Sequence, residues 1–252
     1  MKRLLLATTV LLSGVGCSLA SDLPAKAAPY AVTPAWSWSG FYIGGLAGYG
    51  WGSFDNTVAG VGPSDPSVAL NNHASGGLLG VYAGYNYMLW DRLLIGIETD
   101  YAWTNIRGGG EFGGKLDIGL PGTIPWAAQA NNRLSWLGTT RARVGYAFGG
   151  FLPFVAGGVA YGHIESDGIG VLGSSSIHSN FAVPFSGGAT KTGWTVGTGF
   201  DYAITNNLIA RVEYLYFDLG TASWSVPNTN NQVKVVTDAN GNLVRAGLSY
   251  KF

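Results

Sequence analysis

The chain has 252 residues, and its 14 Lys and Arg balance its 14 Asp and Glu, so the formal net charge is zero. Charged residues make up 11% of the chain and 40 residues are glycine, whereas average soluble proteins have roughly 25% charged residues and about 7% glycine. So few charges cannot cover a surface that faces water, and 13% aromatic residues argue against a disordered chain. Since no basic stripe is present, we do not expect nucleic acid as a partner.

The first residues have the organisation of a secretory signal peptide. Met1-Lys2-Arg3 is a short basic start, Leu4–Val15 is apolar but too short to span a bilayer, and Ser18-Leu19-Ala20 supplies the small residues that precede a cleavage site. We therefore predict a signal peptide over residues 1–20. A lipoprotein that is cut before Cys17 is the alternative.

Residues 21–38 contain three prolines and several alanines and show no apolar period, which predicts an extended periplasmic tether. Beyond them no stretch of 18 consecutive apolar residues occurs, so the sequence predicts no transmembrane helix after the signal peptide.

Alternation of apolar and small residues at a period of two recurs eight times and predicts eight strands. In chain order they are Phe41–Trp51, Val81–Tyr87, Ile95–Trp103, Trp136–Phe148, Phe151–Gly162, Thr192–Ile204, Leu208–Phe217 and Asn242–Phe252.

The links between these strands alternate in length. Those at Met88–Arg92, Gly149-Gly150 and Thr205–Asn207 are short, whereas four are long and rich in Gly, Ser and Asn: Ser53–Gly76, Asn105–Asn132, Ile164–Lys191 and Leu219–Gly241. An even number of strands with tight turns at one end and long loops at the other is typical of bacterial outer-membrane barrels. Residues 39–252 are therefore predicted to form an all-β, eight-stranded antiparallel up-and-down transmembrane β-barrel with four long external loops.

Charged side chains share one face of the predicted strands, and the apolar and aromatic side chains share the other. The charged face must line the lumen, because the other face meets lipid. A turn centred on Asn206 would set Asp201 directly opposite Arg211. In a low-dielectric interior charges persist only when they are paired, so we predict lumen ion pairs among Glu98, Asp100, Arg141, Arg143, Asp201, Arg211, Glu213 and Arg245. In the fifth strand a two-residue turn would place Phe151, Val155, Val159 and Tyr161 outward.

Four segments carry a family resemblance: Trp38–Gly45, Ala83–Asn86, Trp136–Tyr146 and Glu213–Tyr216. They resemble the small outer-membrane β-barrel proteins of Gram-negative bacteria that are called outer-membrane immunogenic or porin-family proteins. The resemblance extends over roughly Ser39 to Phe252 and implies a place in the cell outer membrane, in contact with its lipid and lipopolysaccharide.

The last strand resembles the signal that the barrel-assembly machinery recognises, through Arg245, Gly247, Tyr250 and Phe252. This resemblance implies the assembly machinery and periplasmic chaperones as partners. Just before that strand, Asn240-Gly241 predicts a hairpin turn in the fourth long loop.

Three histidines, His73, His163 and His178, fall in or near the long loops, with Ser166 and Asp167 close to His163. Such common residue types meet by chance easily, so we expect no enzyme activity, cofactor or metal. Because the resembled family includes hemin-binding members, His163 and His178 remain candidate hemin ligands, although no spacing fixes two axial ligands.

Tryptophans near strand ends are typical of the aromatic girdles at a membrane interface. This interpretation applies to Trp38, Trp51, Trp90 and Trp103, and the roles of Trp126 and Trp224 remain open.

The sequence therefore predicts a monomeric structural barrel of the outer membrane that displays surface loops, with adhesion or host interaction as its possible role. A porin-like channel for small solutes and a hemin-binding receptor are the alternatives. Side chains fill an eight-stranded barrel, which argues against a wide pore.

Overall fold

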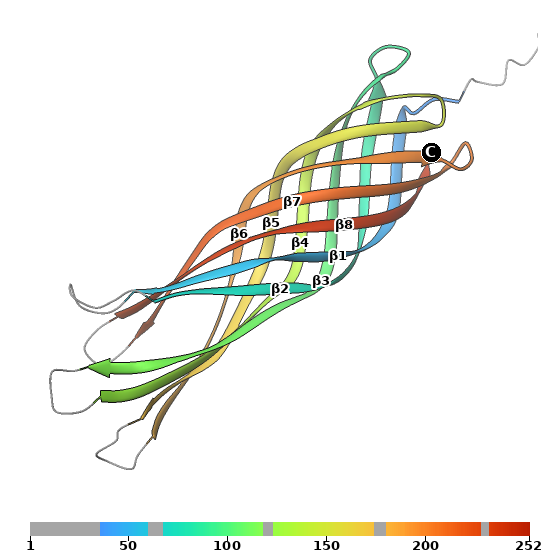
Figure 1. The fold of residues 1–252 in the computed structure, drawn as a ribbon. Coiled ribbons are helices and arrows are strands. Elements are labelled where there is room, and N and C mark those ends of the chain that lie inside the picture. The colour runs from blue at the N-terminus through green and yellow to red at the C-terminus, as the bar shows by residue number, and fades with distance from the viewer. Residues whose placement is uncertain (1–35, 60–67, 118–122, 174–179, 228–231) are drawn as a thin grey trace, which may run out of the picture. The chain divides into compact units, whose positions relative to one another are not determined.

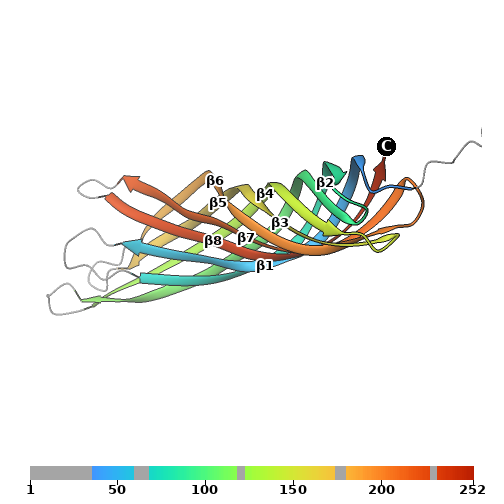
Figure 2. The ribbon, with the colours of Figure 1, turned by 90° about the horizontal axis from the view of Figure 1, so that it is seen from above.

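The computed structural model describes residues 36–59, 68–117, 123–173, 180–227 and 232–252. Within these ranges each strand pairs antiparallel with its neighbours in sequence, and β8 pairs back with β1 to close a barrel (Figures 1 and 2). The predicted all-β, eight-stranded antiparallel barrel is confirmed. Its strands are β1 (Gly40–Ala59), β2 (Val68–Met88), β3 (Leu93–Asp117), β4 (Thr123–Tyr146), β5 (Phe151–Gly173), β6 (Asn180–Ala203), β7 (Leu208–Pro227) and β8 (Gln232–Lys251).

None of the described segments is a helix that is long and apolar enough to cross a membrane.

The strands are about twice as long as the apolar alternation predicts. β1 has 20 residues and β3 has 25, because the stretches rich in Gly, Ser and Asn continue the ladders of hydrogen bonds. The predicted long loops therefore belong mostly to strands, and the connections between them fall at 60–67, 118–122, 174–179 and 228–231, outside the described residues. The predicted turn at Asn240-Gly241 is wrong, since both residues pair with β7 inside β8.

The three short links are confirmed and share one end of the barrel with the C-terminus, which we call the short-turn end (Figure 1). At the β4–β5 link, Gly149 has a φ of 63°, a left-handed conformation that glycine adopts without strain. The opposite end is called the long-strand end.

Two seams interrupt the wall toward the long-strand end. Pairing of β2 with β3 stops at Ser75 and Arg107, and pairing of β6 with β7 stops at Trp194 and Asp218, although all four strands continue. Beyond the seams, β3 to β6 form one sheet and β7, β8, β1 and β2 form another, and the strand ends part into these groups in Figure 1.

Side chains alternate between a lipid-facing wall and a filled interior. Phe41, for example, is 66% exposed, whereas its neighbour Tyr42 is buried. The predicted phase of β5 is confirmed, because Val155 and Val159 are exposed while Phe154 is buried. Apolar side chains therefore cover most of the outside of the barrel in the half nearer the short turns, the surface that lipid requires.

One irregularity in β4 reverses this alternation. The register slips between Leu134 and Trp136, which leaves Ser135 as an extra residue relative to β5. Such a bulge re-aims the side chains beyond it. Leu134 therefore lies buried in the lumen and Arg133 lies exposed on the outer wall, the opposite of what the period in the rest of β4 predicts.

Candidate functional site

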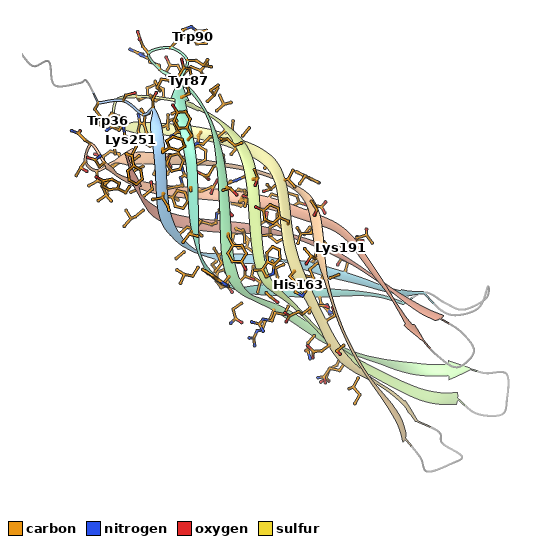
Figure 3. The ribbon with its side chains drawn as sticks, turned by 180° about the vertical axis from the view of Figure 1, so that it is seen from behind. Trp36, Tyr87, Trp90, His163, Lys191 and Lys251 are labelled. Carbon is orange, nitrogen blue, oxygen red and sulfur yellow. The ribbon has the colours of Figure 1, made fainter. Side chains whose placement is uncertain are left out.

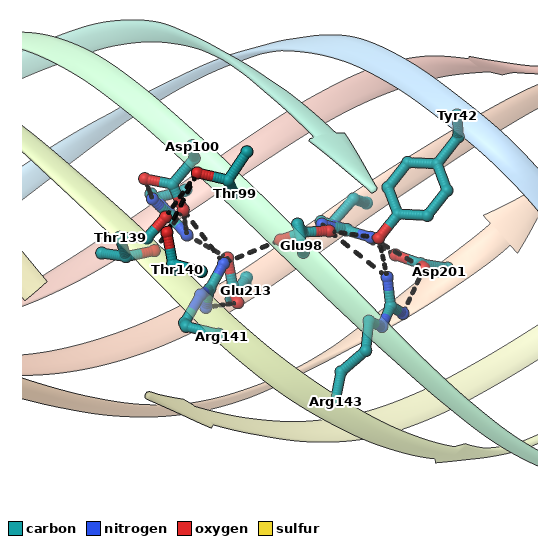
Figure 4. A network of polar contacts seen from close by, with 12 residues as sticks. Tyr42, Glu98, Thr99, Asp100, Thr139, Thr140, Arg141, Arg143, Asp201 and Glu213 are labelled. Atoms are coloured by element: carbon teal, nitrogen blue, oxygen red, sulfur yellow. Dashed lines mark hydrogen bonds and ion pairs between the residues drawn. The ribbon is translucent and has the colours of Figure 1, made fainter. Parts of the chain in front are cut away.

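The eight charged side chains predicted for the lumen lie together inside the barrel, and none is more than 7% exposed (Figure 4). They come from five strands, with the acids on β3, β6 and β7 and the bases on β4, β7 and β8. Four carboxylates thus meet four guanidinium groups. We call this set the ionic layer; its members are Glu98, Asp100, Arg141, Arg143, Asp201, Arg211, Glu213 and Arg245.

Arg141 lies at the centre of one half of the ionic layer. Its Nη2 lies 2.8 Å from Glu98 Oε1 and 3.1 Å from Asp100 Oδ2, and its Nη1 pairs with Glu213. The pair with Glu213 crosses the lumen, since β4 and β7 are not neighbours in the wall. Arg245 completes this half, with Nη2 2.5 Å from Glu213 Oε2 and Nη1 3.2 Å from Asp100 Oδ1.

Asp201 lies at the centre of the other half. It stands directly opposite Arg211 on the neighbouring strand, and Arg211 Nε lies 2.7 Å from Asp201 Oδ1. Arg143 reaches the same carboxylate from β4, with Nη2 2.6 Å from Oδ2. Both arginines also pair with Glu98, which therefore joins the two halves.

Hydroxyl groups and aromatic rings that the sequence analysis did not single out complete the ionic layer. The Tyr42 hydroxyl donates to Glu98 Oε2 at 2.7 Å, and the Thr139 hydroxyl donates to Asp100 Oδ2 at 2.6 Å. The guanidinium carbon of Arg143 lies 4.0 Å from the centre of the Phe154 ring, a cation–π contact. These three residues occupy the inward-facing positions in the two-residue alternation of their strands, and that alternation could have identified them from the sequence.

The charges of the ionic layer are buried and paired with one another inside the lumen. Removing charges from water is costly unless each is paired and hydrogen-bonded, and here every carboxylate contacts at least two arginines.

An apolar layer fills the lumen between the ionic layer and the long-strand end. Its members come from both sheets that part at the seams, so packing across the lumen holds those sheets together. This layer includes Phe54, Ala74, Leu78, Ala102, Ile106, Leu134, Leu137, Ile164, Leu215, Phe217, Leu219, Ala239 and Leu243.

A short N-terminal segment, residues 36–39, closes the short-turn end, and we call it the N-terminal cap. The Nε1–H of Trp38 donates to the Gly149 carbonyl oxygen at 3.0 Å, and the Nε1–H of Trp36 donates to the Asn206 carbonyl oxygen at 3.0 Å. The Ser39 hydroxyl accepts the backbone N–H of Met88 at 3.0 Å. The cap therefore contacts the β4–β5 turn, the β6–β7 turn and the end of β2 beside the β2–β3 turn.

The cap also binds the last strand. The Lys251 ammonium group donates to the Ser37 carbonyl oxygen, and it lies 5.6 Å from the centre of the Trp36 ring. Figure 3 shows Trp36 and Lys251 side by side at this end. Since β8 pairs with β1 here, the cap joins both sides of the barrel closure.

The cap corrects two predictions. Trp38 is 2% exposed and packs with Leu94, Leu152 and Ile209 inside the barrel, so it is not a girdle residue. Residues 36–38, assigned to the tether, are in contact with the barrel rather than extended away from it.

The other girdle candidates face outward. Trp51, Trp103 and Trp90 are exposed, and Trp90 lies at the short-turn end with Tyr87 (Figure 3). The side chains of Trp126 and Trp224 lie outside the described part of the structure.

The structure does not bring the histidine, serine and acid candidates together. His163 faces outward on β5, with its ring stacked 6.4 Å from that of Trp136, and its Nδ1 lies 3.1 Å from the Thr190 hydroxyl oxygen. Ser166 faces inward and donates to Asn132 Oδ1 at 2.5 Å. A nucleophile and a base on opposite faces of one strand cannot exchange a proton.

The remaining candidates are apart from His163. His73 and Asp167 are exposed on β2 and β5, and His178 lies outside the described residues. Across the ranges that the structure describes, no three His, Cys, Asp or Glu side chains are placed to hold a metal ion.

The four residues of the predicted assembly signal divide between the two faces of β8. Arg245 belongs to the ionic layer, and Gly247 lies against the Tyr82 ring, where a Cβ would approach it to 3.1 Å. Tyr250 and Phe252 are exposed and pack edge to face, with ring centres 5.2 Å apart.

Comparison with known proteins agrees with this architecture. The outer membrane protein beta-barrel domain family matches residues 10–252. A 31 kDa outer-membrane immunogenic protein of Brucella melitensis is 37% identical over 221 residues, which cover 86% of this chain and 84% of that protein. A 22 kDa outer membrane protein of Rhizobium leguminosarum bv. viciae is 29% identical over 81% of this chain and 78% of its own length.

Among solved structures, the outer membrane protein OprG from Pseudomonas aeruginosa has a TM-score of 0.47 and 18% identity, over 85% of this chain and 96% of that one. The family match extends over nearly the whole chain and ends at its last residue, Phe252. The chain therefore belongs to the outer membrane protein β-barrel family and is a protein of the outer membrane.

Proposed function

We propose that this protein is a structural barrel that transports no solute and displays the long-strand end on the outside of the cell, where it serves adhesion or host interaction. The observation that carries the proposal is the closed lumen: the N-terminal cap, the ionic layer and the apolar layer follow one another along it. A barrel filled in this way can present its outer end to another surface, but it provides no passage for solutes.

The length of the strands supports display. A strand of 20 residues such as β1, at about 3.3 Å per residue and a tilt near 40°, extends about 50 Å along the barrel axis, roughly twice the 25 Å apolar band of such barrels. The relatives named immunogenic outer-membrane proteins also favour exposure to a host. Wall that extends beyond the bilayer is available for contact with another surface.

We propose further that the protein acts as a monomer without catalysis or a cofactor. Its partners in this proposal are outer-membrane lipid, lipopolysaccharide, periplasmic chaperones and the barrel-assembly machinery. Hemin binding has little support at His163, whose ring already stacks on Trp136.

Cysteine labelling of intact cells tests the display. The single cysteine, Cys17, falls in the predicted signal peptide, so labelling of the mature protein comes only from the cysteine that is introduced. We expect a membrane-impermeant maleimide to label Ser186→Cys, exposed on β6, but not Asp91→Cys, exposed in the β2–β3 turn. Permeabilised cells are the control and should label both. Labelling of Asp91→Cys alone in intact cells would reverse the proposed orientation.

Planar-bilayer recording tests the closed lumen. Because the ionic layer pairs all eight of its charges, we expect at most small, infrequent conductance from the purified protein, and no sugar uptake in liposome swelling. Large and steady single-channel steps from the wild-type monomer would instead support the porin-like alternative.

A further inference from the structure

Two arginines form an unusual pair on the outer wall. Arg107 on β3 and Arg133 on β4 stand directly opposite each other, and both side chains are exposed. Like charges in directly opposed positions of a sheet repel each other. We call these residues the outer arginine pair.

An aromatic belt lies immediately on the short-turn side of the pair. Trp103 stands opposite Trp136, and the Trp136 ring stacks with Tyr101 on one side, at 5.5 Å, and with His163 on the other, at 6.4 Å. Figure 3 marks the place of His163 on the wall. Belts of this kind sit at the membrane–water interface.

The belt fixes the level of the outer arginine pair. Arg133 precedes Trp136 by three residues along β4, which at about 2.5 Å of axial rise per residue places it about 8 Å beyond the belt. That is the depth of lipid headgroups, outside the hydrocarbon core.

Neighbouring acids neutralise the pair only in part. On its other side Arg133 forms one ion pair, with Glu165 directly opposite on β5 at 4.0 Å, and because both side chains are nearly half exposed this pair contributes little. Glu111 and Asp167, further out, accept hydrogen bonds from the amides of Gln129 and Asn131 instead. Within the described ranges, no carboxylate forms an ion pair with Arg107.

We propose that the outer arginine pair binds a phosphate group of an outer-leaflet lipid. Arginines in directly opposite positions can both donate N–H groups to the oxygens of one phosphate, and an anion between them would relieve their repulsion. The adjacent Trp136 ring would pack against the same lipid. The physiological role rests on the proposed function, because it requires the long-strand end to face outward.

Titration of the folded full-length mature protein in zwitterionic detergent micelles tests the proposal, with phosphorylated lipopolysaccharide as the probe. Arg107→Gln/Arg133→Gln is expected to bind about 25-fold more weakly than wild type, about fivefold for each arginine. Arg92→Gln, at an exposed arginine of the short-turn end, is the matched control and should bind like wild type. Arg107→Lys/Arg133→Lys keeps the charge but not the paired donors, so a smaller loss is expected.

Three results would overturn the proposal: glutamine variants that bind within twofold of wild type, wild-type protein that binds dephosphorylated lipopolysaccharide equally well, or full displacement by inorganic phosphate at equal concentration. Heat-dependent electrophoretic mobility checks that each variant is folded. If the double glutamine variant does not fold, the double lysine variant is used for the comparison instead. The micelle titration does not depend on which way the protein is inserted in a membrane. Loss of the expected lipopolysaccharide binding and loss of the expected cysteine labelling can therefore be told apart.

Discussion

Arg141→Met is expected to lower the free energy of unfolding by about 3–5 kcal/mol, the cost of leaving buried charges without their partner. Arg141 contacts Glu98, Asp100 and Glu213 at the centre of the ionic layer, and its removal leaves one carboxylate in excess inside the barrel. Urea unfolding in lipid vesicles, followed by tryptophan fluorescence, measures the change.

Two further variants show whether the loss comes from charge. Arg92→Met removes an exposed arginine of the β2–β3 turn and should change stability by no more than about 0.5 kcal/mol. Adding Glu213→Gln to Arg141→Met restores neutrality, so the double variant should be more stable than the sum of the single changes predicts, by about 0.5–3 kcal/mol. A loss below 1 kcal/mol for Arg141→Met would mean that water reaches the ionic layer.

Trp38→Ala is expected to lower the free energy of unfolding by about 3–5 kcal/mol, as for other large aromatic side chains removed from a core. The indole is buried among Leu94, Leu152 and Ile209 and donates a hydrogen bond to Gly149, and all of these contacts disappear with it. The same vesicle unfolding assay measures this change.

Trp38→Phe is the matched variant. It keeps an aromatic ring and loses the N–H donor, so we expect a smaller loss that includes about 1 kcal/mol for the hydrogen bond. If Trp38→Ala unfolds within 1 kcal/mol of wild type, the N-terminal cap does not hold the short-turn end in the lipid-embedded protein.

Much of the ionic layer follows from the sequence because a strand has a period of two. Once Ile95, Ile97 and Tyr101 mark the lipid face of β3, Glu98 and Asp100 must face inward. The contact between Asp201 and Arg211 follows from a three-residue turn, which sets the register of a hairpin. The contact between Arg141 and Glu213 does not follow, because it depends on how the closed wall brings β4 and β7 across the lumen.

The N-terminal cap could not be predicted for a different reason. Trp38 stands between a Pro- and Ala-rich stretch and the first strand, and an aromatic residue at that place looks the same in a membrane girdle and in a core. Only the positions of Gly149 and Asn206, which come from distant turns, decide that the two cap tryptophans turn inward.

The sequence by itself determined the number of strands and the face on which the charges lie, because both are local consequences of a two-residue period, and its short turns determined the antiparallel order of the strands that they join. The tertiary structure alone decided how far the strands continue, since wall outside the lipid needs no apolar alternation. It also decided the face of Arg133, because the extra residue at Ser135 reverses the phase of β4 where the wall adjusts its pairing with β5.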